Sequence, residues 1–130
     1  MHRSVPLVAA ALISLATALP AHAVAAEPAP AKGLFLTLSG AEGAWMRGVR
    51  LNCAPQPDGP HPEAAAACEA LAAAGGDPDK LQGDPHPCTK RFDPVTVGAT
   101  GSYQGRATAW NKTYANACEL DAATGAVFRF

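Results

Sequence analysis

The residues best suited to do chemistry lie together in one proline-rich segment, residues 84–94, which reads DPHPCTKRFDP. Two adjacent basic residues, Lys90 and Arg91, follow Cys88 and Thr89 and precede Phe92. The prolines fix their own φ angles and stiffen the chain on both sides of the basic pair. A stiff, extended loop loses little conformational entropy when it binds a partner. A solvated charge pair on a turn is the alternative, but the proline framing favours a loop that presents the basic pair.

Catalytic chemistry by the chain itself has little support. The two histidines beyond the N-terminal region, His61 and His86, both lie between prolines in predicted loops. We expect His61 to assist the start of the alanine-rich helix that follows it, rather than to act as a base. The sequence contains no Gly-x-Ser-x-Gly motif, no Walker loop and no cluster with metal-ligand spacing. We therefore predict that the protein is not an enzyme and uses no cofactor and no metal ion.

The chain contains four cysteines, Cys53, Cys68, Cys88 and Cys118. An even number of cysteines in a small exported domain predicts two disulfides. No Cys-x-x-Cys motif occurs, which argues against a zinc site or thioredoxin-like chemistry. Four cysteines allow three connectivities, and their spacing does not choose among them. Each bridge is expected to add about 2–4 kcal/mol of stability.

Residues 1–26 are typical of a secretory signal peptide. A short basic start at Arg3 precedes an apolar run, and Pro20 introduces a region of small residues with cleavage expected after Ala23 or Ala26. The apolar run is shorter than the roughly 20 residues that a membrane-spanning helix needs. We predict an exported, extracellular protein with no membrane partner, in which residues 27–33 form a flexible arm.

Removal of residues 1–26 from the 130-residue chain leaves 104 residues, enough for one domain with a modest core. Of the 10 basic residues only Arg3 is lost, so the mature chain carries 9 basic and 11 acidic residues. No basic patch or run occurs in it. We therefore predict no nucleic-acid partner.

Hydrophobic patterning predicts one α+β domain over residues 34–130. Apolar runs predict five strands, at residues 34–38, 45–53, 92–97, 103–114 and 127–130, with a turn at 98–102. The alanine-rich segment 63–74 predicts a helix that starts after Pro62 and stops at Gly75 and Gly76. Asp77 and Pro78 predict a shorter helix that runs to residue 81. Because strands joined by hairpins dominate, we expect an antiparallel sheet.

Eight segments of the chain resemble the Streptomyces subtilisin inhibitor family, and the cysteine intervals agree as well. They read LFLTL (34–38), LNCAP (51–55), GPHP (59–62), AACEALA (66–72), GGD (75–77), FDPV (92–95), NACE (116–119) and VFRF (127–130). The resemblance therefore runs from about residue 34 to residue 130.

The resemblance implies a five-stranded antiparallel sheet with two helices packed on one side. It implies the disulfides Cys53–Cys68 and Cys88–Cys118, and it places the scissile bond of the family's reactive loop between Lys90 and Arg91. Cys88, Thr89 and Phe92 would contact the protease beside that bond, and Asn116 would support the loop from beneath. It also implies a homodimer that pairs through the sheet face, with Phe35 at the contact.

The implied function is inhibition of serine endopeptidases by substrate-like binding of the loop. The long, positively charged Lys90 suits a pocket with a carboxylate at its base, so we expect trypsin-like and then subtilisin-like targets. The chain departs from the family pattern at Thr89, where proline is common, and at Arg91, where a β-branched apolar residue is common. The alternative is a secreted binding or structural module that uses the same scaffold without inhibiting.

Overall fold

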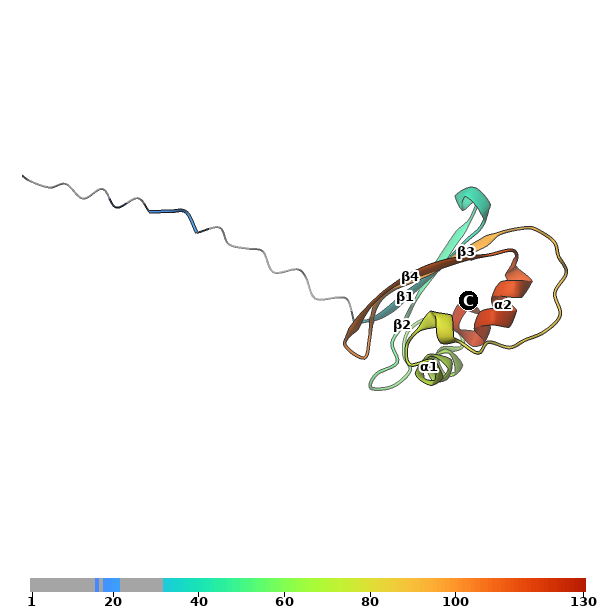
Figure 1. Cartoon of the computed structure of the whole chain (residues 1–130). Coiled ribbons are helices and arrows are strands. Elements are labelled where there is room, and N and C mark those ends of the chain that lie inside the picture. The colour runs from blue at the N-terminus through green and yellow to red at the C-terminus, as the bar shows by residue number, and fades with distance from the viewer. Residues whose placement is uncertain (1–15, 17, 22–31) are drawn as a thin grey trace, which may run out of the picture.

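The computed structural model describes residues 16, 18–21 and 32–130, and residues 32–130 form the folded unit (Figure 1). Most of the predicted signal peptide (1–26) and of the predicted arm (27–33) therefore lies outside the described residues. Lys32 pairs with Ser102, and the first strand begins at Gly33, one residue before the predicted domain start. Among the described residues, no helix has the length and apolar character needed to cross a bilayer.

One antiparallel sheet forms the framework of the described fold. Its four strands are β1 (Gly33–Ser39), β2 (Met46–Leu51), β3 (Val95–Tyr103) and β4 (Arg106–Tyr114). Their order in the sheet is β2-β1-β3-β4, so β1 and β3 are central and β2 and β4 form the edges. Only the β1–β3 pairing joins distant parts of the sequence, and it places Leu36 opposite Ala99.

The prediction of a fifth strand at residues 127–130 is wrong. The 3₁₀ helix η3 (Gly125–Phe128) occupies the first half of that segment, and the described sheet has four strands. Val127 and Phe128 are both buried although they are neighbours in the sequence. Neighbouring residues in a strand face opposite sides of the sheet, so a strand here could not bury both against one core. A helical turn can, and Gly125 permits it with a φ of 57°.

The predicted turn at residues 98–102 is also wrong, because β3 continues through its glycines. Gly98 pairs with both Thr37 and Asn111, and a Cβ added to it would lie 2.7 Å from the Thr37 hydroxyl. The turn instead occurs at Gln104 and Gly105, whose φ angles of 49° and 78° are both positive. A two-residue hairpin loop with two positive φ angles matches the right-handed twist of the strands it joins.

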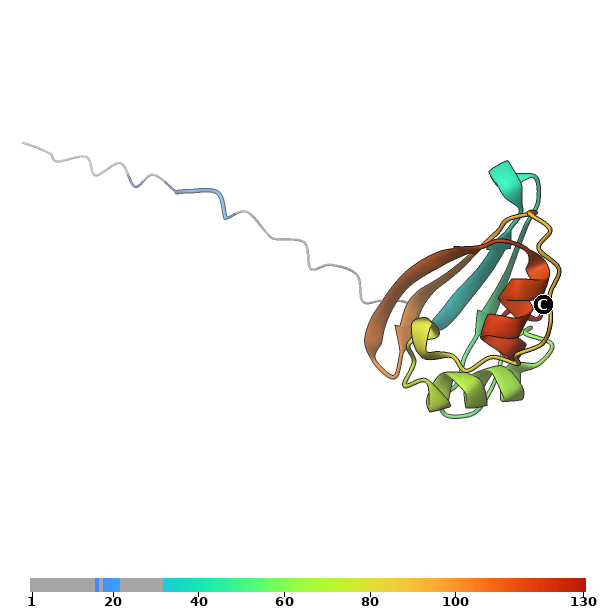
Figure 2. The ribbon, with the colours of Figure 1, turned by 45° about the vertical axis from the view of Figure 1, so that its right-hand side comes forward.

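Two α-helices cover one face of the sheet, as Figure 2 shows. Helix α1 (Ala64–Ala73) is the predicted alanine-rich helix, and the short helix predicted after Asp77 is the 3₁₀ helix η2 (Pro78–Lys80). Helix α2 (Ala117–Thr124) was not predicted from residue patterning. Between the first two strands lies a further 3₁₀ turn, η1 (Ala41–Gly43).

The core lies between the sheet and the helices. The inward side chains of the strands alternate with outward ones, which is the pattern of a sheet covered on one face. The core comprises Leu34, Leu36, Leu38, Val49, Leu51, Val95, Val97, Ala99 and Tyr103 from the sheet, and Ala67, Cys68, Leu71, Leu120, Val127 and Phe128 from the helices and η3.

His61 is buried where the start of α1 meets η3. Its Nε2 lies 2.9 Å from the Val127 carbonyl oxygen, and its Nδ1 accepts a hydrogen bond of 3.0 Å from the Glu63 amide. The expectation that His61 assists the helix start is confirmed. The ring also joins the start of α1 to η3.

Truncation of the core should destabilise the fold far more than truncation of the surface of the same helix. Leu71 is 1% exposed in α1, whereas Glu69 is exposed two residues earlier. We expect Leu71→Ala to lower the free energy of unfolding by about 2–5 kcal/mol. Glu69→Ala should change it by less than about 0.5 kcal/mol. Urea unfolding followed by circular dichroism measures both, and equal losses would contradict the assigned helix face.

Candidate functional site

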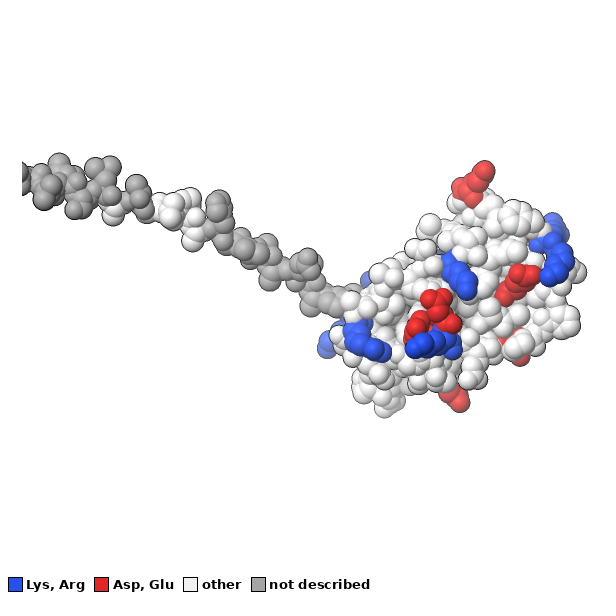
Figure 3. Space-filling view, in the orientation of Figure 1, with Lys and Arg blue, Asp and Glu red and all other residues white. Residues whose placement is uncertain are grey.

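The segment between η2 and β3 forms a long irregular loop beside α2. In Figure 1 it is the yellow-to-orange arc that projects beyond the helices. Thr89, Lys90 and Arg91 are exposed, and Phe92 is 79% exposed. The expectation that Phe92 begins a strand is wrong, because β3 starts at Val95. The basic pair is therefore free to meet a partner, and Figure 3 shows basic side chains at this outer edge.

Each end of the loop is fastened to the α2 region by one backbone hydrogen bond. The amide of Asp84 donates to the Ala122 carbonyl at 3.0 Å, and the amide of Asp93 donates to the Ala115 carbonyl at 2.9 Å. Between these two bonds, the loop makes no other backbone–backbone hydrogen bond with the described part of the chain. Its shape must therefore come from side chains, prolines and the disulfide.

Asn116 supplies the central support. It is only 7% exposed and caps α2, since its Oδ1 accepts a hydrogen bond of 2.8 Å from the Glu119 amide. Its Nδ2 donates to the Thr89 carbonyl at 3.2 Å and to the Arg91 carbonyl at 2.8 Å. One buried amide therefore holds the two peptide groups that flank the Lys90–Arg91 bond.

A disulfide joins the loop to the first turn of α2. Cys88 pairs with Cys118, and Cys53 pairs with Cys68, which is the connectivity that the family resemblance implied. His86, Cys88 and Cys118 have their potential ligand atoms within 4.8 Å of one another. Both sulfurs are consumed by the disulfide, so neither offers the thiolate that metal binding requires.

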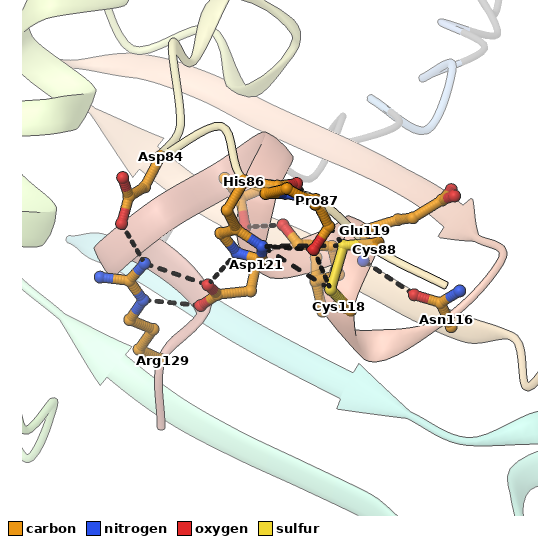
Figure 4. Close-up of polar contacts among 11 residues, drawn as sticks. Asp84, His86, Pro87, Cys88, Asn116, Cys118, Glu119, Asp121 and Arg129 are labelled. Atoms are coloured by element: carbon orange, nitrogen blue, oxygen red, sulfur yellow. Dashed lines mark hydrogen bonds and ion pairs between the residues drawn. A yellow bond between two sulfur atoms is a disulfide. The ribbon is translucent and has the colours of Figure 1, made fainter. Parts of the chain in front are cut away.

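An ion-pair network lies beside this disulfide, on residues that the sequence had not singled out together (Figure 4). His86 Nε2 lies 2.9 Å from Asp121 Oδ2, and Arg129 Nε donates to Asp121 Oδ1 at 2.6 Å. Arg129 also contacts Asp84 at 3.1 Å. The Arg129 guanidinium, and then the His86 ring, lower the pKa of Asp121, and the Asp121 carboxylate raises the pKa of both basic groups.

One cavity in the described part of the chain lies apart from the loop. This cavity of about 560 Å³ lies between the β3–β4 hairpin and the Cys53–Cys68 disulfide, and none of its lining residues belongs to the loop. Lys32 is the one charged residue among them, so acid–base pairs are absent from its lining.

Substitution of Asn116 should separate its two tasks. Asn116→Asp keeps an oxygen for the helix cap but loses the donors to the Thr89 and Arg91 carbonyls, whereas Asn116→Ala loses both. We expect both variants to speed amide hydrogen exchange in the loop. Only the alanine variant should lose the contribution of the cap, which is worth about 1 kcal/mol in urea unfolding. Unchanged exchange in both variants would contradict the role given to this amide.

The chain is similar to known proteins over most of its length. The subtilisin inhibitor-like family matches residues 29–116. The subtilase-type protease inhibitor of Streptomyces coelicolor is 43% identical over 130 residues, which cover 96% of this chain and 86% of the relative. The subtilisin inhibitor of Streptomyces albogriseolus is 39% identical, with coverage of 96% and 90%.

A solved structure shows the same fold. Streptomyces caespitosus sermetstatin, in complex with Bacillus licheniformis subtilisin, matches with a TM-score of 0.64 and 36% sequence identity. The match covers 75% of this chain and 97% of the sermetstatin chain. The chain therefore belongs to the subtilisin inhibitor-like family, whose members are protease inhibitors and not enzymes.

Proposed function

We propose that this protein inhibits serine endopeptidases by presenting the loop as a substrate, with the Lys90–Arg91 bond in the active site of the protease. The observation that carries the proposal is the double hydrogen bond from Asn116 to the Thr89 and Arg91 carbonyls. It holds the exposed bond from beneath while leaving its outer side open. The sermetstatin–subtilisin complex supports a serine protease as the partner.

The Asn116 hydrogen bonds and the Cys88–Cys118 disulfide explain how a substrate-like loop would resist hydrolysis. Cleavage after Lys90 would separate an acyl fragment, which contains Thr89, from a leaving fragment that begins with Arg91. The Asn116 amide bonds to one carbonyl in each fragment, and the Cys88–Cys118 disulfide adds a covalent link on the acyl side. The new amine would stay beside the acyl carbon, so that rejoining of the bond competes with attack by water.

The residues near the bond set the expected targets. Lys90 suits a specificity pocket that contains a carboxylate, as in trypsin-like enzymes. Thr89 lacks the fixed φ of the proline that is common in the family, but its carbonyl is held by Asn116. Arg91 and Phe92 lie exposed on the leaving side, where they would contact the protease together with Cys88 and Thr89 on the acyl side. Trypsin-like and subtilisin-like proteases are the proposed partners.

Export and dimerisation complete the proposal. A signal peptide at residues 1–26 would deliver the chain outside the cell, where its two disulfides would persist. The outer sheet face would meet a second copy, because the Phe35 ring lies exposed over Gly48 with Arg50 beside it. Small residues such as Gly98 leave that face flat enough for close approach.

Mixing the purified protein with trypsin and with subtilisin tests the proposed function. We expect both proteases to lose activity while the Lys90–Arg91 bond stays largely intact. Lys90→Ala should weaken trypsin inhibition by at least about 30-fold, because it removes a side chain that fills the specificity pocket. Subtilisin inhibition should fall much less. Lys80→Ala, which removes an exposed lysine from η2, serves as the matched control.

Rapid and complete cleavage at Lys90–Arg91 with full protease activity would overturn the inhibitor proposal and favour the non-inhibitory module. Equal losses against trypsin and subtilisin in Lys90→Ala would show that Lys90 is not the specificity residue.

Sedimentation equilibrium tests the proposed homodimer. We expect the unaltered protein to have the mass of two chains, and Phe35→Asp to have the mass of one, because an unpaired charge would be buried in the contact. Glu69→Lys, on the exposed face of α1, should leave the dimer intact. A dimer that survives Phe35→Asp with the fold unchanged would place the contact elsewhere.

A further inference from the structure

We propose that His86 is a positioning residue of the reactive loop. In its protonated form it ties the incoming side of the loop to α2 through Asp121, so that inhibition is tighter at mildly acidic pH than at alkaline pH. This inference rests on the proposed function, because it concerns how the same loop is held. The incoming side of the loop is residues 84–88, which precede the basic pair. The contact of His86 is made on this side, and the opposite side of the loop continues into β3.

The incoming side has few other means of attachment. Pro85 and Pro87 carry no amide hydrogen and so cannot donate backbone hydrogen bonds. The one backbone bond on this side comes from Asp84, and the next fixed point is the Cys88 disulfide. The His86 side chain acts between those two points. It reaches α2 at Asp121, one residue before the carbonyl that Asp84 uses.

The surroundings of the ring suit an imidazolium. Nε2 lies 2.9 Å from the Asp121 carboxylate, and Nδ1 lies 3.4 Å from the Pro87 carbonyl oxygen. A neutral imidazole carries one N–H and can donate to only one of these acceptors, whereas the protonated ring can donate to both. Two acceptors on opposite sides of the ring therefore favour the charged form.

The carboxylate partner is itself held in place. Arg129, from the segment after η3, donates to Asp121 through Nε and Nη2 and also contacts Asp84 in the loop. Figure 4 shows Asp121 between Arg129 and His86, with Asp84 on the far side of Arg129. The charged groups that face the ring are thus Asp121 from α2 and Asp84 from the loop, with Arg129 behind both.

The direction of the pH effect follows from the pKa shifts. The hydrogen bond to Asp121, and then the one to the Pro87 carbonyl, raise the pKa of His86 above its usual value. A raised pKa in the folded state means that the stabilisation is complete below the ordinary pKa of about 6.5 and is lost as the pH rises through the folded value. At the acidic end, Arg129 lowers the pKa of Asp121 and keeps it charged.

The test compares the unaltered protein with His86→Gln, which keeps a neutral donor but loses the charge. Dissociation constants for trypsin and subtilisin are measured from pH 5.5 to 8.5. At each pH the constant of the variant is divided by that of the unaltered protein, so that the effect of pH on the protease itself cancels. We expect a ratio of about two- to fivefold at the acidic end, the range for a partly exposed ion pair, and a ratio near one at the alkaline end.

Two further variants identify the partner. His86→Gln should have no further effect in an Asp121→Asn background, because the pairwise interaction is already absent there. Glu119→Gln removes the same charge from the same helix without removing the partner of His86, and it should leave the pH dependence intact. A ratio that does not change with pH, or independent effects of His86→Gln and Asp121→Asn, would overturn the inference.

A measurement without protease separates this inference from the proposed function. Amide hydrogen exchange of residues 86–92 is compared between unaltered protein and His86→Gln at each pH. Exchange that is faster in the variant only at acidic pH supports the His86–Asp121 contact, even if the unaltered protein inhibits neither protease. If the unaltered protein inhibits and His86→Gln exchanges at the same rate at all pH values, the role given to His86 is contradicted and the proposed function is not affected.

Discussion

The structure of the loop depends on one buried side-chain amide. Asn116 caps α2 with its oxygen and holds the carbonyls of Thr89 and Arg91 with its nitrogen. Leaving a buried polar group without a partner costs more free energy than forming its hydrogen bond gains. The helix cap and the two loop contacts of Asn116 are therefore maintained together. The position of the helix and the shape of the loop are therefore set by the same residue. The loop can lack regular structure and still have a defined shape.

Most of the strands and the loop could be predicted from residue patterning, whereas the structure of residues 117–130 could not. The segments around Leu36 and Val49 show the alternation that one covered face requires. Val127 and Phe128 are consecutive apolar residues, and such a short run fits a strand or a buried turn equally well. Helix α2 has Asn116 and Glu119 in the spacing of a helix N-terminus, but its eight residues give little periodicity.

The candidate site was predictable in its residue types but not in its contacts. The prolines and the basic pair marked the loop, and resemblance to a family gave the disulfide partners and Asn116. The network of His86, Asp121 and Arg129 joins residues up to 43 positions apart, from loop, helix and C-terminal segment. No local pattern connects such residues, because only the packing of α2 against η3 and the loop brings them together.

The attachments of the loop have a consequence for the order in which the chain is made. The partners that hold residues 84–93 are Ala115, Asn116, Cys118, Asp121, Ala122 and Arg129, all of which follow the β3–β4 hairpin in the sequence. A ribosome therefore completes the basic pair well before it completes anything that can hold it. During synthesis the loop is an ordinary flexible segment, and it acquires its shape only when the last part of the domain has emerged and folded back.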